Sequence, residues 1–448
     1  MLFQLEERLP VALPVAGADK PVPLRPDEEA PADQQRQQPM TAPLPAAGAP
    51  ALAPFGVRSF RFQWPADLAT SWAFEMETLI LGWYVLTATG SVQQLVIFGA
   101  LGWLGSLVSP FFGVVGDRIG MRALLCATRG AYALFAALLT VLTLSDALLP
   151  WHVFAIAALA GLIRPSDMMM RYVLVGQTMR PELLMGALGI SRTTSDTARV
   201  AGALAGTGGV ALIGMGPAYV VVTAMYVAAF LLSLGVAGPT PGAPQGQANG
   251  AAVKTLAGLQ HAVRYVWNKP DLLGAFSIAF LANLLAFPFF LGLLPYVAKD
   301  VYAIGQSGLG YLAAAFALGA LAGSLLLAAR RVPLRAGRAM LCSGAVWFVA
   351  ILLFGQTRSV GAGLVLLFAS GFAQSLCLTP LAAVMLRASS QEMRGRVMGM
   401  RMLAIWGLPA GLLAAGPIIE RFGYAASTLL YAGLGLAATL ALGYRWRR

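Results

Sequence analysis

Twelve long apolar runs, separated by short turn signals, fill this chain from Trp64 to its end. A helix rises 1.5 Å per residue, so roughly 20 apolar residues carry it across the hydrocarbon core of a bilayer. Each run reaches that length. The sequence therefore predicts an all-α polytopic membrane protein with twelve transmembrane helices, at residues 66–90, 92–115, 122–145, 150–178, 182–212, 216–237, 271–298, 306–329, 336–356, 359–387, 393–418 and 424–444.

The balance of apolar and charged residues excludes a soluble domain. Hydrophobic residues make up 58% of the 448 residues and charged residues 11%, whereas about 25% of the residues of a soluble domain are charged. The formal net charge is +12. Because the arginines stand singly at the ends of apolar runs, this excess is typical of membrane topology and not of a nucleic-acid-binding surface.

Lysine and arginine are distributed unevenly between alternate connections of the predicted helices. One set of connections holds most of them, while the other holds only Lys299, Arg358 and Arg421. Basic residues accumulate in cytoplasmic loops. We therefore expect a multi-pass protein of the plasma (inner) membrane with both termini and the central loop in the cytoplasm.

The longest break between apolar runs divides the chain into two halves of six helices each. We predict a first half at 64–237, a linker at 238–270 and a second half at 271–448. The linker begins with a flexible Gly/Pro-rich stretch, and its part from 254 to 269 is predicted to be an amphipathic helix on the membrane surface. A solvated connector is the alternative for this part.

We assign residues 1–63 to a disordered cytoplasmic N-terminal tail. The segment 1–56 contains 11 of the 27 prolines and shows no hydrophobic periodicity, which is typical of a disordered tail. It lacks the basic start and apolar core of a secretory signal. Met40 would also serve as a translation start.

The sequence offers few groups for enzymatic, metal or haem chemistry. Cys126, Cys342 and Cys377 lie singly in apolar runs, and the two histidines, His152 and His261, fall near predicted helix ends. No disulfide framework or metal site follows from this spacing. We expect no cofactor and no enzymatic activity. A membrane receptor or scaffold is a further alternative, although the chain shows no folded sensor domain.

Charged residues inside the predicted helices are concentrated in the first half. They form two trios, Arg164, Asp167 and Arg171 in the fourth span and Arg192, Asp196 and Arg199 in the fifth. Each trio lies along one stripe of its helix, and the two trios mirror each other about the turn that joins the helices. An antiparallel hairpin with a small axial offset would let each aspartate bridge arginines of both helices.

The first predicted span supplies two further carboxylates, Glu75 and Glu77. Two residues apart on a helix corresponds to about 200°, so the two side chains should face different neighbours. Charges in a membrane are costly and mark either ion-pair networks or functional sites. One interpretation is a buried network that fixes helix packing. The other is a proton-exchanging carboxylate with an arginine that alternates between it and a substrate, and we favour the glutamates for that role.

The second half is apolar and aromatic by comparison. Asn283 and Gln374 are its candidate polar residues for a substrate cavity. The aromatic residues Phe287, Phe290 and Trp347 have two possible roles. They either line the transport pathway, which would require a substrate with a large apolar part, or face the lipid or a packed core.

The connection between the second and third predicted spans reads GVVGDRIGMR. It resembles the loop signature of the major facilitator superfamily, with a departure at Met121. The resemblance implies two pseudo-symmetric six-helix halves, transport by alternating access and a conformational lock in this loop. Gly113, Asp117, Arg118, Gly120 and Arg122 stand on the motif positions, and Gly116 belongs to the same predicted lock loop.

Two further stretches resemble the branch of the superfamily that includes the enterobactin exporter and drug:proton antiporters. They read RPSDMMMRYVLVGQTMRPELL, with the following ISRTTSDTARVAGALAG, and MRGRVMGMRMLAIWGLPAG. The Gly-Pro of the fifth-helix antiporter motif is absent, because Ala203 stands where proline is expected.

We therefore expect a monomeric secondary transporter that exports a small amphipathic molecule, either a drug-like compound or a siderophore, in exchange for protons. The alternative is a proton-coupled importer of an organic anion that is held by Arg164 or Arg199.

Overall fold

The computed structural model describes residues 52–106, 115, 118–237, 263–328, 336–390, 393, 397, 401 and 403–445, and it is almost entirely helical there. The first half contains η1 (Ala53–Gly56), α1 (Arg58–Thr89), α2 (Val92–Leu101), α4 (Met121–Leu144), α5 (Pro150–Thr178), α6 (Pro181–Ile213) and α7 (Met215–Leu234). The second half contains α9 (Pro270–Leu281), η3 (Ala282–Ala286), α10 (Phe287–Leu291), α11 (Leu294–Tyr296), η4 (Val297–Val301), α12 (Gln306–Ala328), α13 (Ala336–Gln356), α14 (Val360–Ala388), η5 (Ala404–Trp406), α16 (Gly407–Phe422) and α17 (Tyr424–Arg445).

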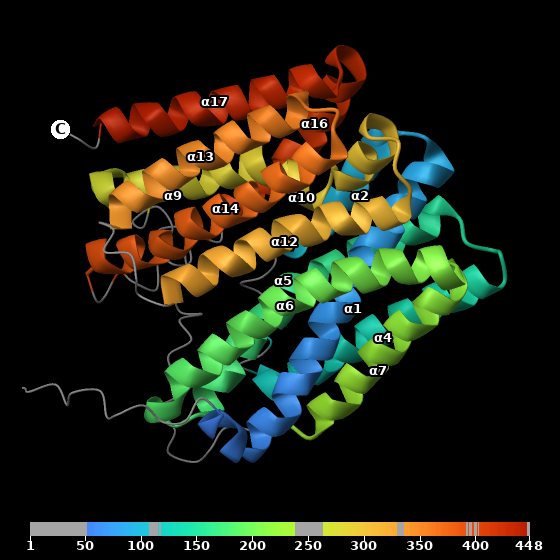
Figure 1. Cartoon of the computed structure of the whole chain (residues 1–448). Helices are drawn as coiled ribbons and strands as arrows, with labels where there is room; N and C mark the ends of the chain where they lie inside the picture. The colour runs from blue at the N-terminus through green and yellow to red at the C-terminus, as the bar shows by residue number, and fades with distance from the viewer. Residues whose placement is uncertain are drawn as a thin grey trace, which may run out of the picture. The chain divides into compact units, whose positions relative to one another are not determined.

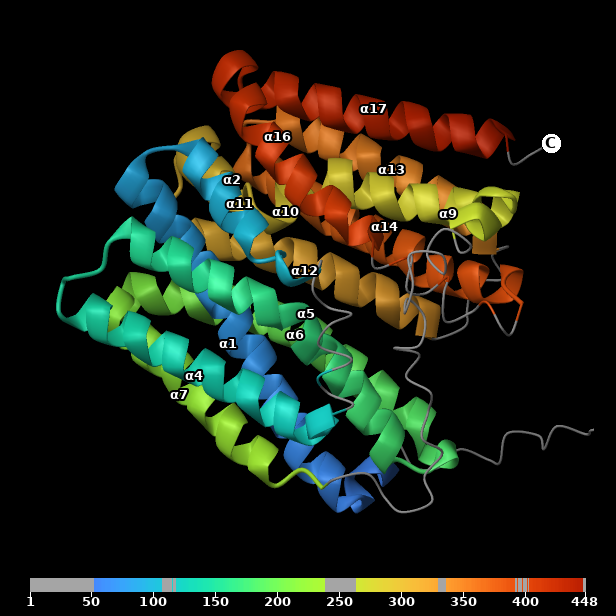
Figure 2. The same ribbon diagram turned by 180° about the vertical axis from the view of Figure 1, so that it is seen from behind.

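Eight helices of the described chain are long and apolar enough to cross a membrane. The helices α1 and α6 are still longer, with 32 and 33 residues. The predicted charges of the first half lie on these two helices and on α5. In both views α4 and α7 lie side by side, as do α13 and α17 (Figures 1 and 2). The predicted all-α polytopic fold is confirmed.

Several helix boundaries differ from the prediction. The helix α2 ends at Leu101, well before the predicted 115. The helix α1 begins at Arg58, inside the segment 1–63 that we assigned to the tail. The predicted span 271–298 is interrupted: α10 ends at Leu291, and the chain continues through the short α11 and η4. Pro288 and Pro295 explain the interruption, because proline donates no hydrogen bond and clashes with the preceding turn. The last helix of the eleventh span continues to Phe422, beyond the predicted 418, and ends at Gly423 with φ +81°.

The predicted amphipathic helix at 254–269 lies partly outside the described residues. Residues 263–267 are helical. Lys269 Nζ donates a hydrogen bond to the carbonyl of Ala388 at 3.1 Å, and the amide of Ser390 donates one to the hydroxyl of Tyr265 at 3.1 Å. The end of the linker is therefore anchored on the end of α14.

The second half has a core of aromatic side chains. Phe289, Phe290 and Trp347 are buried. Phe290 stacks on Phe316 with ring centroids 4.3 Å apart, and Phe287 meets Trp347 edge-on at 5.3 Å. Of the two roles left open for these aromatics, the packed core is confirmed.

The two halves meet along α6 and α12 and along α2 and α16. Glycines permit this approach: a Cβ at Gly310 of α12 would collide with the hydroxyl of Thr207 and approach the carbonyl of Ala203 to 3.0 Å. A Cβ at Gly416 of α16 would collide with Gln93 of α2. These contacts lie toward the ends of α6 and α16 and the start of α2. Ser324 of α12 also donates to Asp196 midway along α6, so α6 and α12 are in contact well beyond this end of the bundle.

Candidate functional site

A central cavity of about 160 Å³ opens among the helices of the first half. Its charged lining residues are Glu75 and Glu77 of α1, Arg164 of α5 and Arg199 of α6. Of the ten cavity residues that the sequence suggested, the structure thus brings four together. Apolar and aromatic side chains form most of the remaining wall, so the charges face a space that suits an amphipathic molecule.

Glu75 forms an ion pair with Arg199. The distance between Glu75 Oε1 and Arg199 Nε is 3.3 Å, and the two side chains are 23% and 35% exposed. Gly202 lies nearly one turn further along α6 and allows α1 to approach, since a Cβ there would come within 2.8 Å of the Glu75 Cβ. The backbone of α6 thereby places the pair on the cavity wall.

Glu77 faces a different helix, as the angle along α1 predicts. Tyr219 donates to Glu77 Oε1 at 3.1 Å, and Tyr226 donates to Oε2 at 2.8 Å. Both tyrosines belong to α7, and the ring of Tyr132 packs 5.6 Å from that of Tyr226. Two phenol hydroxyls therefore satisfy this half-buried carboxylate, whereas an arginine satisfies Glu75.

Arg164 stacks on aromatic rings. Its guanidinium carbon lies 3.2 Å above the ring centroid of Phe74 and 4.8 Å from that of Trp103. Among the described residues no carboxylate lies within 4 Å of it. Cation–π contact stabilises such a desolvated cation without neutralising it.

The other residues of the fourth-span trio belong to a separate cluster, which we name the four-charge ring: Asp67, Arg129, Asp167 and Arg171. Arg129 contacts both Asp67 and Asp167 Oδ1, the latter at 3.5 Å. Arg171 lies 2.5 Å from Asp167 Oδ2 and 3.7 Å from Asp67 Oδ1. The ring joins α1, α4 and α5, and Arg129 also donates to Ser233 of α7 at 2.6 Å.

The expectation that each aspartate bridges arginines of both hairpin helices is wrong. The partners of Asp167 lie on α4 and α5, and Arg199 of α6 pairs with α1 instead. The physical reason is the position of α1, which packs along α6 and against α5. Its acidic side chains reach the arginines first.

Sequence reasoning missed Asp67 and Arg129. Each stands inside a predicted apolar run, Asp67 near the start of the first and Arg129 in the third. A single charge within such a run is the signal that would have found both, because unpaired charges are rare in a membrane helix.

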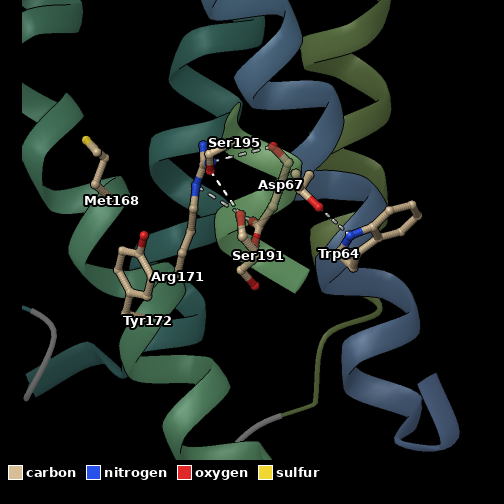
Figure 3. Close-up of a pocket in the computed structure, with 8 residues that line it drawn as sticks. Trp64, Asp67, Met168, Arg171, Tyr172, Ser191 and Ser195 are labelled. Atoms are coloured by element: carbon tan, nitrogen blue, oxygen red, sulfur yellow. Dashed lines mark hydrogen bonds and ion pairs between the residues drawn. The ribbon is translucent and has the colours of Figure 1, made fainter. Parts of the chain in front are cut away.

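A small cavity of about 40 Å³ adjoins the ring between α1, α5 and α6 (Figure 3). Arg171 and Asp67 point toward each other in this view, and Trp64 Nε1 donates to the hydroxyl of Thr194 at 2.7 Å. Met168 lines this cavity and the central one. The two spaces are therefore neighbours along α5.

The fifth-span residues Arg192 and Asp196 lie outside the central cavity. Arg192 is 59% exposed and pairs with Asp196 at 3.3 Å, while Ser324 of α12 donates to Asp196 Oδ2 at 3.3 Å. Asp196 thus contacts the opposite half. Asn283 and Gln374 are not among the lining residues of the central cavity either. The Asn283 amide donates to the carbonyl of Ala279 at 2.8 Å.

Half of the loop motif falls within the described residues, and Gly113, Gly116 and Asp117 lie outside them. Gly120 has φ +89°, a conformation that disfavours any side chain. Arg122 donates to the carbonyl of Leu234 at 2.6 Å and so caps the end of α7. Arg118 is exposed.

The sequence profile described as Major Facilitator Superfamily matches residues 51–414. The chain belongs to the major facilitator superfamily. It is accordingly a membrane transporter and not an enzyme, and its transport is secondary. A search of curated protein sequences gives no significant match.

Solved structures of other transporters share the fold of this superfamily member. The human organic anion transporter MFSD10 has a TM-score of 0.61 and 17% identity, over 86% of this chain and 99% of that one. The nucleoside transporter NupG has a TM-score of 0.63 and 13% identity, over 87% and 99% of the two chains. The Escherichia coli fucose:proton symporter FucP has a TM-score of 0.55 and 13% identity, over 87% and 98%.

Proposed function

We propose that this transporter exports a small amphipathic molecule through the central cavity in exchange for protons. The observation that carries the proposal is the ion pair of Glu75 and Arg199, 3.3 Å apart on the cavity wall. A proton and an arginine compete for the same carboxylate. Binding of a proton to Glu75 therefore frees Arg199, and its release restores the pair.

The position of the pair connects this exchange to movement. Arg199 belongs to α6, which packs against α12 of the other half. An uncompensated charge is costly in a site shielded from water. Loss of this partly shielded pair therefore favours a different arrangement of α6. Protonation at α1 thereby acts on the contact between the halves, as alternating access requires.

The finer assignments belong to the same proposal. The resemblance to the enterobactin-exporter branch supports a drug-like compound or a siderophore as substrate. The distribution of basic residues supports an inner-membrane protein with both termini in the cytoplasm. The loop residues Asp117 and Arg118 are proposed to lock one conformation, and the protein is proposed to act as a monomer.

Proton-coupled import of an organic anion is the second candidate. The cavity holds two arginines, Arg164 and Arg199, and the fold resembles that of a protein described as an organic anion transporter. An exporter that exchanges substrate for protons accumulates substrate on the acidic side of the membrane. A proton-coupled importer accumulates it on the side opposite the acidic one.

Vesicles of opposite orientation separate the two candidates. The substrate would be taken from a screen for compounds that stabilise the purified protein. We expect accumulation in inside-out vesicles that are acidified inside, and its loss in Glu75→Gln with substrate binding retained. Accumulation only in right-side-out vesicles would favour import. Full pH-dependent efflux in the double variant Glu75→Gln/Glu77→Gln would refute proton coupling at these glutamates.

A further inference from the structure

Arg164 is the cavity cation that forms no ion pair within 4 Å with a carboxylate of the described residues. Glu75 pairs with Arg199, and Glu77 accepts hydrogen bonds from two tyrosines. Neither carboxylate lies within 4 Å of the Arg164 guanidinium. A cation inside a membrane protein is costly unless a counter-charge reaches it, so the site is built for an anion that arrives from elsewhere.

The stacking geometry selects which atoms of Arg164 remain available. The guanidinium is planar, and its N–H groups point outward in the plane. Phe74 covers one face at 3.2 Å, and Trp103 lies 4.8 Å away. The π-contacts use the face of the group and leave its edge. That edge matches the two oxygens of a carboxylate, which an arginine binds with two parallel hydrogen bonds.

The surroundings of Arg164 determine the rest of the ligand. The same cavity is lined by Leu81, Phe98, Ile156 and Leu291. These side chains offer no hydrogen bonds and favour an apolar or aromatic body. A molecule that fills this space therefore presents its charge at one end and an apolar surface at the other.

We propose that Arg164, which lies against the rings of Phe74 and Trp103, is the binding subsite for the carboxylate of an apolar, aromatic acid. This assignment deepens the proposed function and rests on transport through the central cavity. Phe74 and Trp103 act as positioning residues, because they hold the guanidinium with its edge available.

Three naphthalene derivatives of matched size test the assignment on the purified full-length protein in nanodiscs. The probes are 2-naphthoate, its neutral analogue 2-naphthamide and the cationic 2-naphthylmethylamine, with affinity measured by calorimetry. We expect the acid to bind at least about ten-fold more tightly than the amide, as the loss of a charge-assisted bidentate contact implies. Arg164→Gln should abolish that preference, and Arg164→Lys should retain part of it.

Arg192→Gln is the matched control, because Arg192 is exposed and lies outside the cavity. It should keep the full preference. A readout on the unmodified protein covers the case in which Arg164→Gln does not fold: 2-naphthoate, but not 2-naphthamide, should slow the reaction of Arg164 with phenylglyoxal, followed by peptide mass spectrometry.

Four outcomes would overturn the assignment. The acid fails to bind, or it binds no more tightly than the amide. The preference for the acid survives Arg164→Gln, or 2-naphthoate does not protect Arg164 from phenylglyoxal. The vesicle experiment fails independently. If the acid is preferred but no proton-driven flux is found, the proposed function is wrong and the subsite assignment stands. If proton-driven flux is found without a preference for the acid, the subsite assignment is wrong.

Discussion

The two halves of this transporter bury different chemistry within the same architecture. The first half buries charged side chains, both around the central cavity and in the four-charge ring. The second half buries stacked aromatic rings, including Phe290, Phe316 and Trp347. Ion pairs depend on protonation and on partners, whereas aromatic packing depends on shape. Under the proposed function, the switchable interactions lie in the first half, and the second half is their rigid counterpart.

The largest expected effect tests the four-charge ring. Arg129→Met removes the cation that touches both Asp67 and Asp167, and it leaves two carboxylates to share Arg171. Breaking a buried pair in this way costs about 3–5 kcal/mol. We expect a correspondingly large fall in thermal stability of the purified protein. The companion variant Arg129→Met/Asp67→Asn should recover part of it, and a loss below about 1 kcal/mol would contradict a structural role for the ring.

A smaller effect is expected when the aromatic core is altered. Trp347→Phe keeps an aromatic ring at a fully buried position but reduces its volume. We expect a destabilisation of about 1–3 kcal/mol, with the pH dependence of transport unchanged. Thermal unfolding and proton-driven flux measured on the same preparation check both statements. A shifted pH profile would show that the second half takes part in the switch.

The contact between the halves should respond to a single methyl group. Gly310→Ala places a Cβ against Thr207 and the carbonyl of Ala203. We expect the helices to separate there and the population of conformers to shift, as measured by spin-label distances between α6 and α12. The matched control is Gly209→Ala on α6, where a Cβ meets nothing within 4 Å. Identical distance distributions in both variants would contradict a close contact at Gly310.

The smallest effect concerns the end of the linker. The ammonium of Lys269 and contacts with Ser390 lower the pKa of Tyr265 to about 8. A phenol with a lowered pKa binds its partners more strongly when ionised, so the contact strengthens as the pH rises from about 8 to 10 and loses this gain as the pH falls through 8. The phenolate absorbance near 295 nm should show one tyrosine titrating near pH 8. Tyr265→Phe should remove that step, and titration of this tyrosine near pH 10 would contradict the interaction.

Much of the fold could be predicted because span length and turn residues act locally. The prediction 150–178 matches α5, and 336–356 matches α13. The orientation of Glu75 and Glu77 toward different helices also followed from helix geometry. The partners of charged residues depend on which helices are neighbours in the bundle. Helix neighbours are set by the tertiary arrangement and not by the local sequence. The mirror symmetry of the two trios suggested a direct contact between α5 and α6, but α1 supplies Glu75 to Arg199 and Asp67 to Arg171.

The complete burial of Arg129 has a consequence for how the chain enters the membrane. A lone arginine near the middle of a span adds about 2.5–3.5 kcal/mol to the insertion of its helix. Asp67 precedes Arg129 in the chain and Asp167 follows it. When α4 is synthesised, Asp67 on α1 is therefore already present, whereas Asp167 on α5 is not. The charge of Arg129 can be compensated during synthesis only if α1 stays beside α4, and both partners are present only after α5 has been synthesised.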